Sequence, residues 1–256
     1  LNGLILIAMI RNASKIFTSN GAYLVANVAI ADLLTALNSS LWGIKKSFLL
    51  SETVTNASFS LFWTSIEASF LTIFVMSLER YIAILHPFKA NLWLSKTRTI
   101  HSCILIWIIS GLCGIYMTFN KETARLVLAL FFEITILVTC FLYYKIFIKL
   151  EQRRKSLTLQ WSNNHGNSEL QREYQLTTVV AVLTIILIVT VLPYMIAGQI
   201  SVTKYDANLR LFLHYYFPVE LTNFLLNPIV YALRLPKYRS AILKTLRGCQ
   251  TMEQYD

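Results

Sequence analysis

Charged side chains are scarce in this sequence, and their scarcity excludes a water-soluble globular protein. Asp, Glu, Lys and Arg make up 14% of the 256 residues, whereas hydrophobic residues make up 55%. Soluble domains carry about 25% charged residues. So few charges could not cover the surface of a soluble protein of 29.4 kDa with a mean hydropathy of +0.54. The composition therefore predicts a membrane protein.

Glycine, proline and cysteine are also few. The 8 glycines and 5 prolines exclude collagen-like and low-complexity chains. The four cysteines (Cys103, Cys113, Cys140 and Cys249) lie within apolar runs or near the chain end, so no disulfide is expected on the outer face. The net charge of +10 would suggest nucleic-acid binding in a soluble protein. Here the charges sit in short clusters between apolar runs, so we expect no nucleic-acid partner.

Six apolar runs are long enough to cross a bilayer, which takes about 20 residues. They cover residues 16–44, 54–78, 102–120, 126–144, 174–203 and 211–233. Residues 1–10 are uncharged but too short to span, and a signal peptide would start with a basic stretch and end in a cleavage site of small residues. We interpret them as part of a truncated first helix. The sequence thus predicts an all-α bundle of seven transmembrane helices forming one domain, residues 1–256.

The distribution of basic residues predicts the orientation of this bundle. With seven spans and the chain start outside, 17 of the 23 Lys and Arg residues fall on the inner side. Positive charge favours the cytoplasmic side of a membrane. We therefore expect a multi-pass protein of the plasma membrane whose chain starts outside and ends in the cytoplasm.

The segments on the inner side differ in character. Residues 151–171 are polar and are predicted to form a third cytoplasmic loop, flanked by extensions of the helices on either side. In residues 235–247 basic and apolar side chains alternate at helical spacing, which predicts an amphipathic helix on the inner membrane face. Residues 248–256 then begin a cytoplasmic tail. No internal repeat is visible, which disfavours transporters built from inverted repeats.

Three of the predicted spans carry polar residues along one helix face. These residues are Asp32, then Ser65 and Ser69, then Glu220, Asn223 and Asn227. A charge at the bilayer centre costs roughly 2.5–3.5 kcal/mol on insertion scales, so buried charges indicate function. The alternative is a hydrogen bond that only packs helices together. Because lipid cannot satisfy polar groups, the three faces are expected to meet in a polar core suited to a small cation.

Further motifs occur along the chain in a fixed order. They are NVAIAD at 27–32, Glu79-Arg80-Tyr81 with IAILHPF after it, Trp107, Tyr143, Pro193, Asn227-Pro228-Ile229-Val230-Tyr231, and RLPKYR at 234–239. This set resembles the rhodopsin-like (class A) G-protein-coupled receptors over essentially the whole chain. The resemblance implies a receptor, not an enzyme, that binds an extracellular ligand and activates a heterotrimeric G protein by opening helix six. The segment at 235–247 would then be the amphipathic helix eight of the family.

The resemblance also assigns roles to single residues. It places an allosteric sodium site at Asp32, Ser69, Asn223 and Asn227, with Asn2 nearby, and implies no other metal or cofactor. It places the switch and the G-protein contact at Glu79, Arg80, Tyr81, Tyr143, Glu173, Pro193, Pro228 and Tyr231. We expect Arg80 to pair with Glu173 in the resting receptor, because a guanidinium near lipid needs a carboxylate. The alternative for Glu173 is an ordinary solvated charge.

Several positions depart from the common family pattern. Thr55 stands in place of the helix-three cysteine, Thr135 in place of the helix-five proline, and Val191 in place of the helix-six tryptophan. The outer loop at 120–124 is very short. These losses resemble the melanocortin-receptor branch and its adenosine- and cannabinoid-receptor relatives.

The ligand site is predicted by exclusion. No lysine lies between 204 and 237 to bind retinal, and Phe62 stands where monoamine receptors carry an aspartate. The predicted pocket consists of Phe62, Trp63, Glu67, Phe70, Tyr194 and Glu220, enlarged by the small Val191. The aromatic residues have an alternative role in helix packing. Two buried carboxylates favour a cationic or peptidic ligand if charged, and a lipid or nucleoside if neutral.

Two surface modifications are predicted, and one other function class stays open. Asn56 is expected to carry a glycan outside the cell, whereas Asn12 lies inside and should stay bare. Cys249, just after the amphipathic helix, is a predicted lipidation site. A multi-span transporter with intramembrane carboxylates is the alternative function. The sequence has no P-loop, no metal-spaced His and Cys set and no nucleophile elbow.

Overall fold

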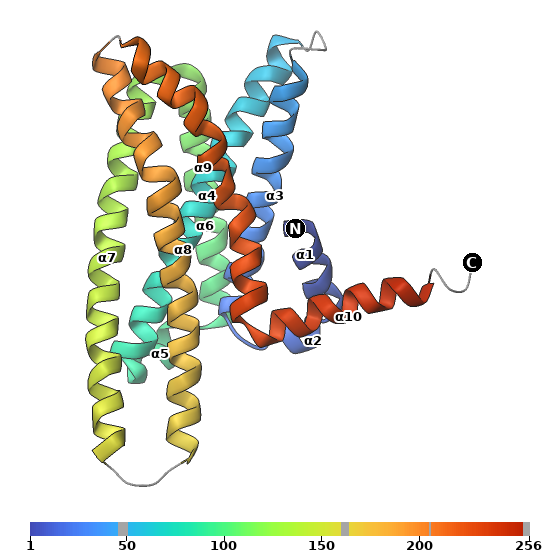
Figure 1. Ribbon diagram of the computed structural model, residues 1–256, viewed down its shortest axis with the longest axis vertical. Coiled ribbons are helices and arrows are strands. Elements are labelled where there is room, and N and C mark those ends of the chain that lie inside the picture. Colours follow the sequence, from blue (N-terminus) through green and yellow to red (C-terminus); the bar gives the residue numbers. More distant parts are fainter. Residues whose placement is uncertain (46–50, 160–163, 205, 253–256) are drawn as a thin grey trace.

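The computed structural model describes residues 1–45, 51–159, 164–204 and 206–252, and every regular element within these ranges is a helix (Figure 1). The helices are α1 (Asn2–Arg11), α2 (Ala13–Ile16), α3 (Gly21–Lys45), α4 (Glu52–Leu85), α5 (Pro87–Trp93), α6 (Lys96–Phe119), α7 (Lys121–Leu159), α8 (Asn164–Thr203), α9 (Ala207–Arg234) and α10 (Pro236–Met252). The predicted all-α architecture is confirmed for this part of the chain.

Within the described residues, five helical segments are long and apolar enough to cross a membrane. They are Gly21–Leu41, Glu52–Leu85, Lys96–Phe119, Lys121–Lys155 and Glu173–Thr203. They contain most or all of the first five long apolar runs of the sequence. The helix α1 is too short, with 10 residues, and α9 is less apolar because it contains Pro218, Glu220, Asn223 and Asn227. The structure thus confirms a helical membrane bundle with five clear spanning segments.

The long helices run roughly parallel or antiparallel, and α10 leaves the foot of α9 almost at a right angle to them (Figure 1). We call the end of the bundle beside α10 the α10 end and the opposite end the far end. Four of the long helices begin after a side chain that accepts a backbone N–H. Ser51 caps α4, Ser95 caps α6, Asn120 caps α7 and Asp206 caps α9. The positions of these capping residues in the sequence explain where the helices begin.

The connections between the helices are short. Only Asn120 separates α6 from α7, in agreement with a very short loop there. Helices extend into the segment at 151–171 from both sides, as expected: α7 continues to Leu159 and α8 begins at Asn164. Glu151 forms ion pairs with Arg154 at 2.9 Å and Lys155 at 3.8 Å, one turn away, and such pairs support a helix. Residues 160–163 lie outside the described residues.

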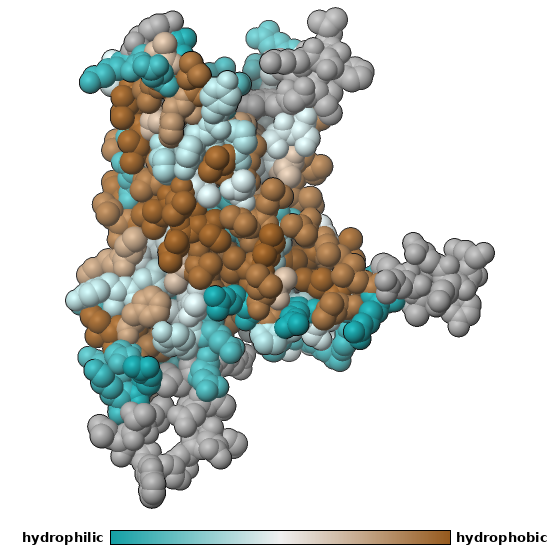
Figure 2. All heavy atoms as spheres, viewed as in Figure 1, coloured by the Kyte–Doolittle hydropathy of each residue, from teal (hydrophilic) through white to brown (hydrophobic). Residues whose placement is uncertain are grey.

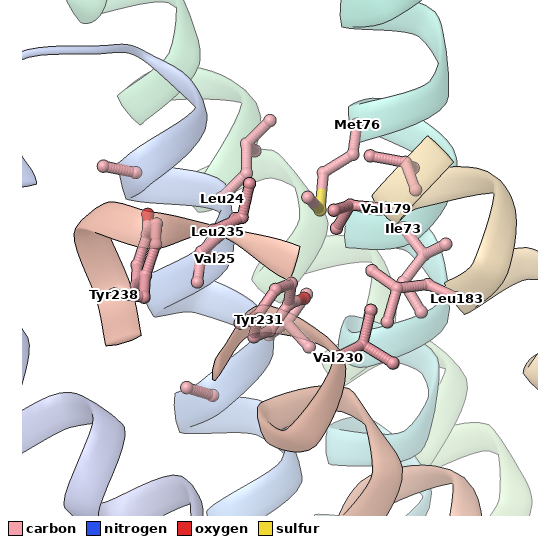
Figure 3. Close-up of a cluster of buried hydrophobic side chains, with 14 of the residues drawn as sticks. Leu24, Val25, Ile73, Met76, Val179, Leu183, Val230, Tyr231, Leu235 and Tyr238 are labelled. Carbon is pink, nitrogen blue, oxygen red and sulfur yellow. The ribbon is translucent and has the colours of Figure 1, made fainter. Parts of the chain in front are cut away.

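The bundle has two buried apolar clusters and an apolar outer surface. The cluster at the α10 end surrounds Tyr231, which Figure 3 shows beside Tyr238, Val230 and Leu183. The cluster nearer the far end contains many aromatic residues. Large apolar side chains also lie exposed along the helices, and Figure 2 shows them as a broad band around the middle. A surface of this kind is suited to lipid rather than to water.

A glycine allows the closest approach between α4 and α6. A Cβ atom built at Gly114 would overlap the Thr64 Oγ1 atom and lie 2.5 Å from the Ser60 carbonyl oxygen. At Gly111, three residues earlier on the same helix, no atom lies within 4 Å of such a Cβ. Gly114 is therefore required by packing, whereas Gly111 is not.

We expect Gly114→Ala to lower the free energy of unfolding by about 1–3 kcal/mol, because the added methyl group forces α4 and α6 apart. Gly111→Ala serves as the control and should be neutral or slightly stabilising, since alanine favours helices. Thermal unfolding of the purified proteins in detergent measures the difference. Equal melting temperatures for the two variants would show that the close contact does not limit stability.

Candidate functional site

A row of polar contacts joins α3 to α4 through the middle of the membrane bundle. Its four pairs are Asn27 with Thr72 at 2.7 Å, Asp32 with Ser69 at 2.6 Å, Thr35 with Ser65 at 3.0 Å, and Asn38 with Ser58 at 3.2 Å. All eight side chains are buried. Successive pairs lie about one to two turns apart along these antiparallel helices, and each pair satisfies groups that lipid would leave unpaired.

Asp32 is the one acid in this row and also reaches α9. Its Oδ1 accepts a hydrogen bond from Ser69 Oγ at 2.6 Å, and its Oδ2 accepts one from Asn227 Nδ2 at 2.8 Å. The carboxylate is 0% exposed. The two consecutive helices α3 and α4 and the distant α9 therefore converge on one buried carboxylate, as the polar spacing in the sequence predicts.

The oxygen atoms around Asp32 fit a small cation. In the part of the chain that the structure describes, Asn227 Oδ1 and both amide atoms of Asn223 are buried without a hydrogen-bond partner. Hard cations prefer ligands of this kind, namely carboxylate, hydroxyl and amide oxygens. The four residues predicted for sodium therefore include unused oxygens. Neither amide atom of Asn223 forms a hydrogen bond to Asp32. Asn223 also lines the small cavity beside Glu67.

Two asparagines outside the predicted ion site form hydrogen bonds that join its helices to neighbouring helices. Asn2 Nδ2 donates to the Phe224 carbonyl oxygen at 2.9 Å, so it ties α1 to α9 and makes no direct bond to Asp32. Asn27 Oδ1 accepts a hydrogen bond from Trp107 Nε1 at 2.8 Å, which ties α6 to the α3–α4 row. The sequence analysis missed the role of Asn27. The signal was available, because an indole N–H inside a membrane needs an acceptor.

The ion pair predicted between Arg80 and Glu173 is absent from this structure, and that prediction is corrected here. Arg80 pairs with its neighbour Glu79 at 3.2 Å, and Glu173 pairs with Arg153 at 3.0 Å. Arg153 also donates to the Ile84 carbonyl oxygen at 2.9 Å. The reason is the length of α7, which carries Arg153 to the inner part of α8, whereas the sequence analysis counted Arg153 only among the charges of the inner segments.

A cavity of about 620 Å³ opens at the α10 end between α3, α4, α8 and α10. Glu79, Arg80, Glu173, Gln175 and Tyr238 are among its lining residues. Tyr238 is mostly buried; this burial, and next the charge of Glu79, raise the pKa of its phenol, so it stays neutral. The cavity therefore brings together polar groups and the charged residues of the predicted switch, Glu79, Arg80 and Glu173.

Three of the remaining predicted switch residues, Tyr81, Tyr143 and Tyr231, lie in or against the buried cluster at the α10 end. Tyr143 and Ser77 form a hydrogen bond of 3.2 Å between their hydroxyl groups, which joins α7 to α4. Tyr231 is 0% exposed, and its hydroxyl has no partner within the described residues. Tyr81 packs edge-on against His86. Pro193 and Pro228 each lie inside a helix, α8 and α9, where a proline removes one backbone hydrogen bond.

We expect Glu173 and Arg153 to behave as a coupled pair. Glu173→Gln and Arg153→Gln should each lower the melting temperature, and the loss in the double variant should be smaller than the sum of the two single losses, since each single variant already lacks the pair. Arg153→Gln also removes the hydrogen bond to the Ile84 carbonyl oxygen, so it should be the more destabilising single change. A part-exposed pair of this kind contributes about 0.5–1 kcal/mol. A double-mutant cycle by thermal unfolding measures the coupling.

The control cycle combines Glu173→Gln with Arg80→Gln, whose effects should add, because Arg80 contacts Glu79 instead. Coupling of Glu173 to Arg80 with additivity toward Arg153 would reinstate the pair predicted from the sequence.

Aromatic residues of the predicted ligand pocket lie together at the far end. Phe62 packs against Trp63 at 5.8 Å between ring centroids and against Phe217 at 6.2 Å, and Phe217 continues to Tyr194 at 6.0 Å. Phe217 therefore links α4, α8 and α9, a role that the sequence analysis missed. Phe70 lies deeper, against Phe132 of α7 at 4.5 Å. Phe62, Trp63 and Phe70 are buried, so their contacts also serve as helix packing.

The two acids of the predicted pocket are buried in separate surroundings. Glu67 is 2% exposed and lines a cavity of about 10 Å³ together with Asn223 and Val191. Glu220 is 1% exposed, and both of its oxygens have no hydrogen-bond partner among the residues that the structure describes. The expectation that Val191 enlarges the cavity is wrong. Phe70, Phe132 and Phe224 fill the space, leaving room for about one water molecule.

The structure also places the predicted modification sites. Asn56 is exposed near the start of α4, at the far end. Asn12 lies between α1 and α2, near α10, and its Nδ2 donates to the Ala8 carbonyl oxygen at 2.9 Å. The two asparagines thus lie toward opposite ends of the bundle. The side chain of Cys249 lies outside the described residues.

Comparison with known proteins adds an independent finding. The sequence model of the family described as "7 transmembrane receptor (rhodopsin family)" matches residues 1–127. Melanocortin receptor 3 of Mus musculus is 21% identical over 98% of this chain and 82% of its own length. Melanopsin-B of Xenopus laevis is 23% identical over 96% of this chain and 52% of its own length. The type-1 angiotensin II receptor of Homo sapiens is 27% identical over 46% of this chain and 33% of its own length.

Proposed function

Since the chain belongs to the rhodopsin-like family of seven-transmembrane receptors, we propose that it binds an extracellular ligand and activates a heterotrimeric G protein. In this proposal α9 is a further membrane crossing beside the five clear spanning segments, and the short α1 forms the inner part of a seventh. The helix α10 is the amphipathic helix on the inner membrane face. The chain start then lies outside and the α10 end faces the cytoplasm, in accord with the excess of Lys and Arg on that side.

The observation that carries the proposal is the cavity of about 620 Å³ at the α10 end. It is lined by Arg80 and Glu79, and it is large enough to admit a segment of a protein partner. An opening at the cytoplasmic end of a helical bundle, with a part-buried arginine in its wall, suits recognition of a G protein. Movement of the inner part of α8, which carries Glu173 and Gln175, would widen or close this cavity.

The ion site of the proposal consists of Asp32, Ser69, Asn223 and Asn227. Asp32 would supply the negative charge and Ser69 a hydroxyl oxygen, and the unused amide oxygens of the two asparagines would complete the set. A sodium ion there would hold α3, α4 and α9 together and stabilise the resting arrangement. The ion and the active packing would compete for the same space, so the ion would oppose activation.

The ligand in this proposal enters from the far end and is a peptide or small molecule, not retinal and not a monoamine. Buried Glu220 has no partner among the described side chains, so it is available to a basic group of the ligand. The aromatic series from Phe62 through Phe217 to Tyr194 forms the adjoining wall. The alternative of a transporter is not favoured, because the melanocortin and angiotensin relatives are named receptors.

The test of this function is guanine-nucleotide exchange. The full chain, reconstituted in lipid vesicles, should accelerate exchange of GDP for GTP on at least one heterotrimeric G protein from a panel covering all classes. A ligand found by screening should accelerate it further. A chain that is folded by thermal unfolding but accelerates exchange on none of them, with or without ligand, would reject the proposal.

We expect Glu220→Gln to weaken a cationic agonist by over 1 kcal/mol, because it removes a charge-assisted hydrogen bond in a buried site. Glu133→Gln is the matched control, since it removes the carboxylate of another intramembrane glutamate, a half-buried residue of α7, and should leave the agonist affinity unchanged. Competition binding on membranes measures both. Unchanged agonist affinity in the Glu220 variant would instead favour a neutral ligand, such as a lipid or nucleoside.

A further inference from the structure

Arg125 is a basic residue on the inner face of α7, near the far end of the bundle. It begins a row of inward-facing side chains, because buried Leu128, Ala129 and Phe132 follow it at the i+3, i+4 and i+7 positions of the helix. Arg125 is itself partly buried and forms no ion pair with any residue that the structure describes. A guanidinium group in a membrane bundle without a carboxylate partner indicates a function.

The aliphatic part of Arg125 lies against α8. A Cβ atom built at Gly198 would be 3.4 Å from Arg125 Cδ, so the missing side chain of this glycine leaves room for the arginine. Tyr194 precedes Gly198 by one turn on the same face of α8. The Tyr194 hydroxyl interacts electrostatically with both Arg125 of α7 and Glu220 of α9. One tyrosine therefore lies near a cation and an anion that come from two other helices.

Glu220 is the anion of this set. It is almost completely buried, and neither of its oxygens has a hydrogen-bond partner in the described part of the chain. Phe217, three residues earlier on the same helix, packs against the ring of Tyr194. Arg125 and Glu220 form no ion pair with each other. Two opposite charges on the inner side of the bundle thus lack a counter-ion within the described ranges, and Tyr194 lies near both.

The two charges lie at different depths. Both α7 and α9 begin at the far end (Figure 1), where Arg125 is the fifth residue of α7 and Glu220 is the fourteenth residue of α9. With a rise of 1.5 Å per residue, these residues lie about 6 Å and about 20 Å along their helices. Since the long arginine side chain covers part of the difference, the two charged groups are roughly 10 Å apart. An extended chain of three residues spans about the same length.

We propose that the extracellular ligand is a short peptide of about three residues, whose terminal carboxylate binds Arg125 and whose terminal ammonium group binds Glu220. The inference rests on the proposed function, because it concerns the ligand of the same site. A guanidinium binds a carboxylate through two parallel hydrogen bonds. The Tyr194 hydroxyl both donates and accepts, so it can bind the peptide backbone between the two ends. A single α-amino acid is too short to reach both charges, and a purely cationic ligand would leave Arg125 unpaired.

The experiment is thermal unfolding of the full chain in detergent with a library of tripeptides that have free ends, pooled by their central residue. At least one pool should raise the melting temperature by about 2–4 °C. The same tripeptides with an amidated carboxyl end, or with an acetylated amino end, should bind at least about tenfold more weakly. Each of these forms loses one charge-assisted contact.

Variants of the basic residue test the contact itself. Arg125→Gln should weaken the free tripeptide at least about tenfold and leave the affinity of the amidated form nearly unchanged. Retained binding of the amidated form shows that the variant is folded. Arg125→Lys keeps the charge and should lose less than Arg125→Gln. The matched control is Lys121→Gln, one turn earlier on α7, whose ammonium group lies over the ring of Phe59, and it should keep the affinity within about twofold.

Three results would overturn the inference: no stabilisation by any pool, equal affinity of the free and amidated tripeptides, or equal losses in Arg125→Gln and Lys121→Gln. None of these readouts needs a G protein. Nucleotide exchange that is accelerated by a ligand without a carboxylate, equally in the parent and in Arg125→Gln, would also overturn it, although the proposed function would then stand.

Discussion

An Asp32→Asn variant is expected to lose the stabilisation that sodium gives to the parent protein. Asp32 provides the negative charge of the proposed ion site, and its carboxylate joins α3 to Ser69 and Asn227. An amide of the same size keeps the shape of the site but removes the charge. Because an ion that binds only the folded state stabilises it, replacing potassium by sodium should raise the parent melting temperature by about 2–4 °C.

The Asp32→Asn variant should show no such rise. Thermal unfolding of both proteins in sodium and in potassium measures the difference in melting temperature. The control is Glu133→Gln, a change of another carboxylate within a spanning helix, which should keep the full response to sodium. An equal rise in melting temperature in sodium for the Asp32 variant and the parent would show that Asp32 does not bind sodium.

Gln175→Trp is expected to lower the rate of ligand-stimulated nucleotide exchange on the order of tenfold, which corresponds to about 1.4 kcal/mol of lost G-protein binding. Gln175 is exposed and lines the cavity of about 620 Å³, so an indole ring there would occupy space that the G protein needs. Ligand affinity should change little, because the change lies at the opposite end of the bundle from Glu220. Exchange assays and ligand binding on the same vesicles give both values.

The matched control is Tyr174→Trp, at the neighbouring position. Tyr174 is exposed, does not line the cavity and contacts the ring of Phe147, so tryptophan should be tolerated. Equal losses of exchange in the two variants would show that the cavity is not the G-protein contact.

The sequence predicted the polar centre of the bundle correctly for a physical reason. Helical spacing places Asn223 and Asn227 on one face, and lipid cannot satisfy a carboxylate, so Asp32 had to meet polar partners on other helices. The observed bonds to Ser69 and Asn227 agree with this expectation. The two facts predict that the polar faces meet, and the family resemblance singled out Ser69 and Asn227 as the residues beside Asp32.

Features that depend on helix length and side-chain packing could not be predicted in the same way. The partner of Glu173 depends on how far α7 continues, and the helix-forming segment after Leu150 brings Arg153 into reach. The space beside Val191 depends on three phenylalanines from α4, α7 and α9, which fill it. Neither the end of a helix nor the rotamers of its neighbours can be derived from one position of the sequence.

The central claim is that the ion site at Asp32 and the cavity at Arg80 belong to one receptor that activates a G protein. The most direct measurement is the rate of GTP exchange on a coupled G protein by the reconstituted full chain, in sodium and in potassium at equal ionic strength. The account predicts slower basal exchange in sodium for the parent protein and equal rates in both salts for Asp32→Asn. Accelerated exchange that does not depend on sodium in the parent would contradict it.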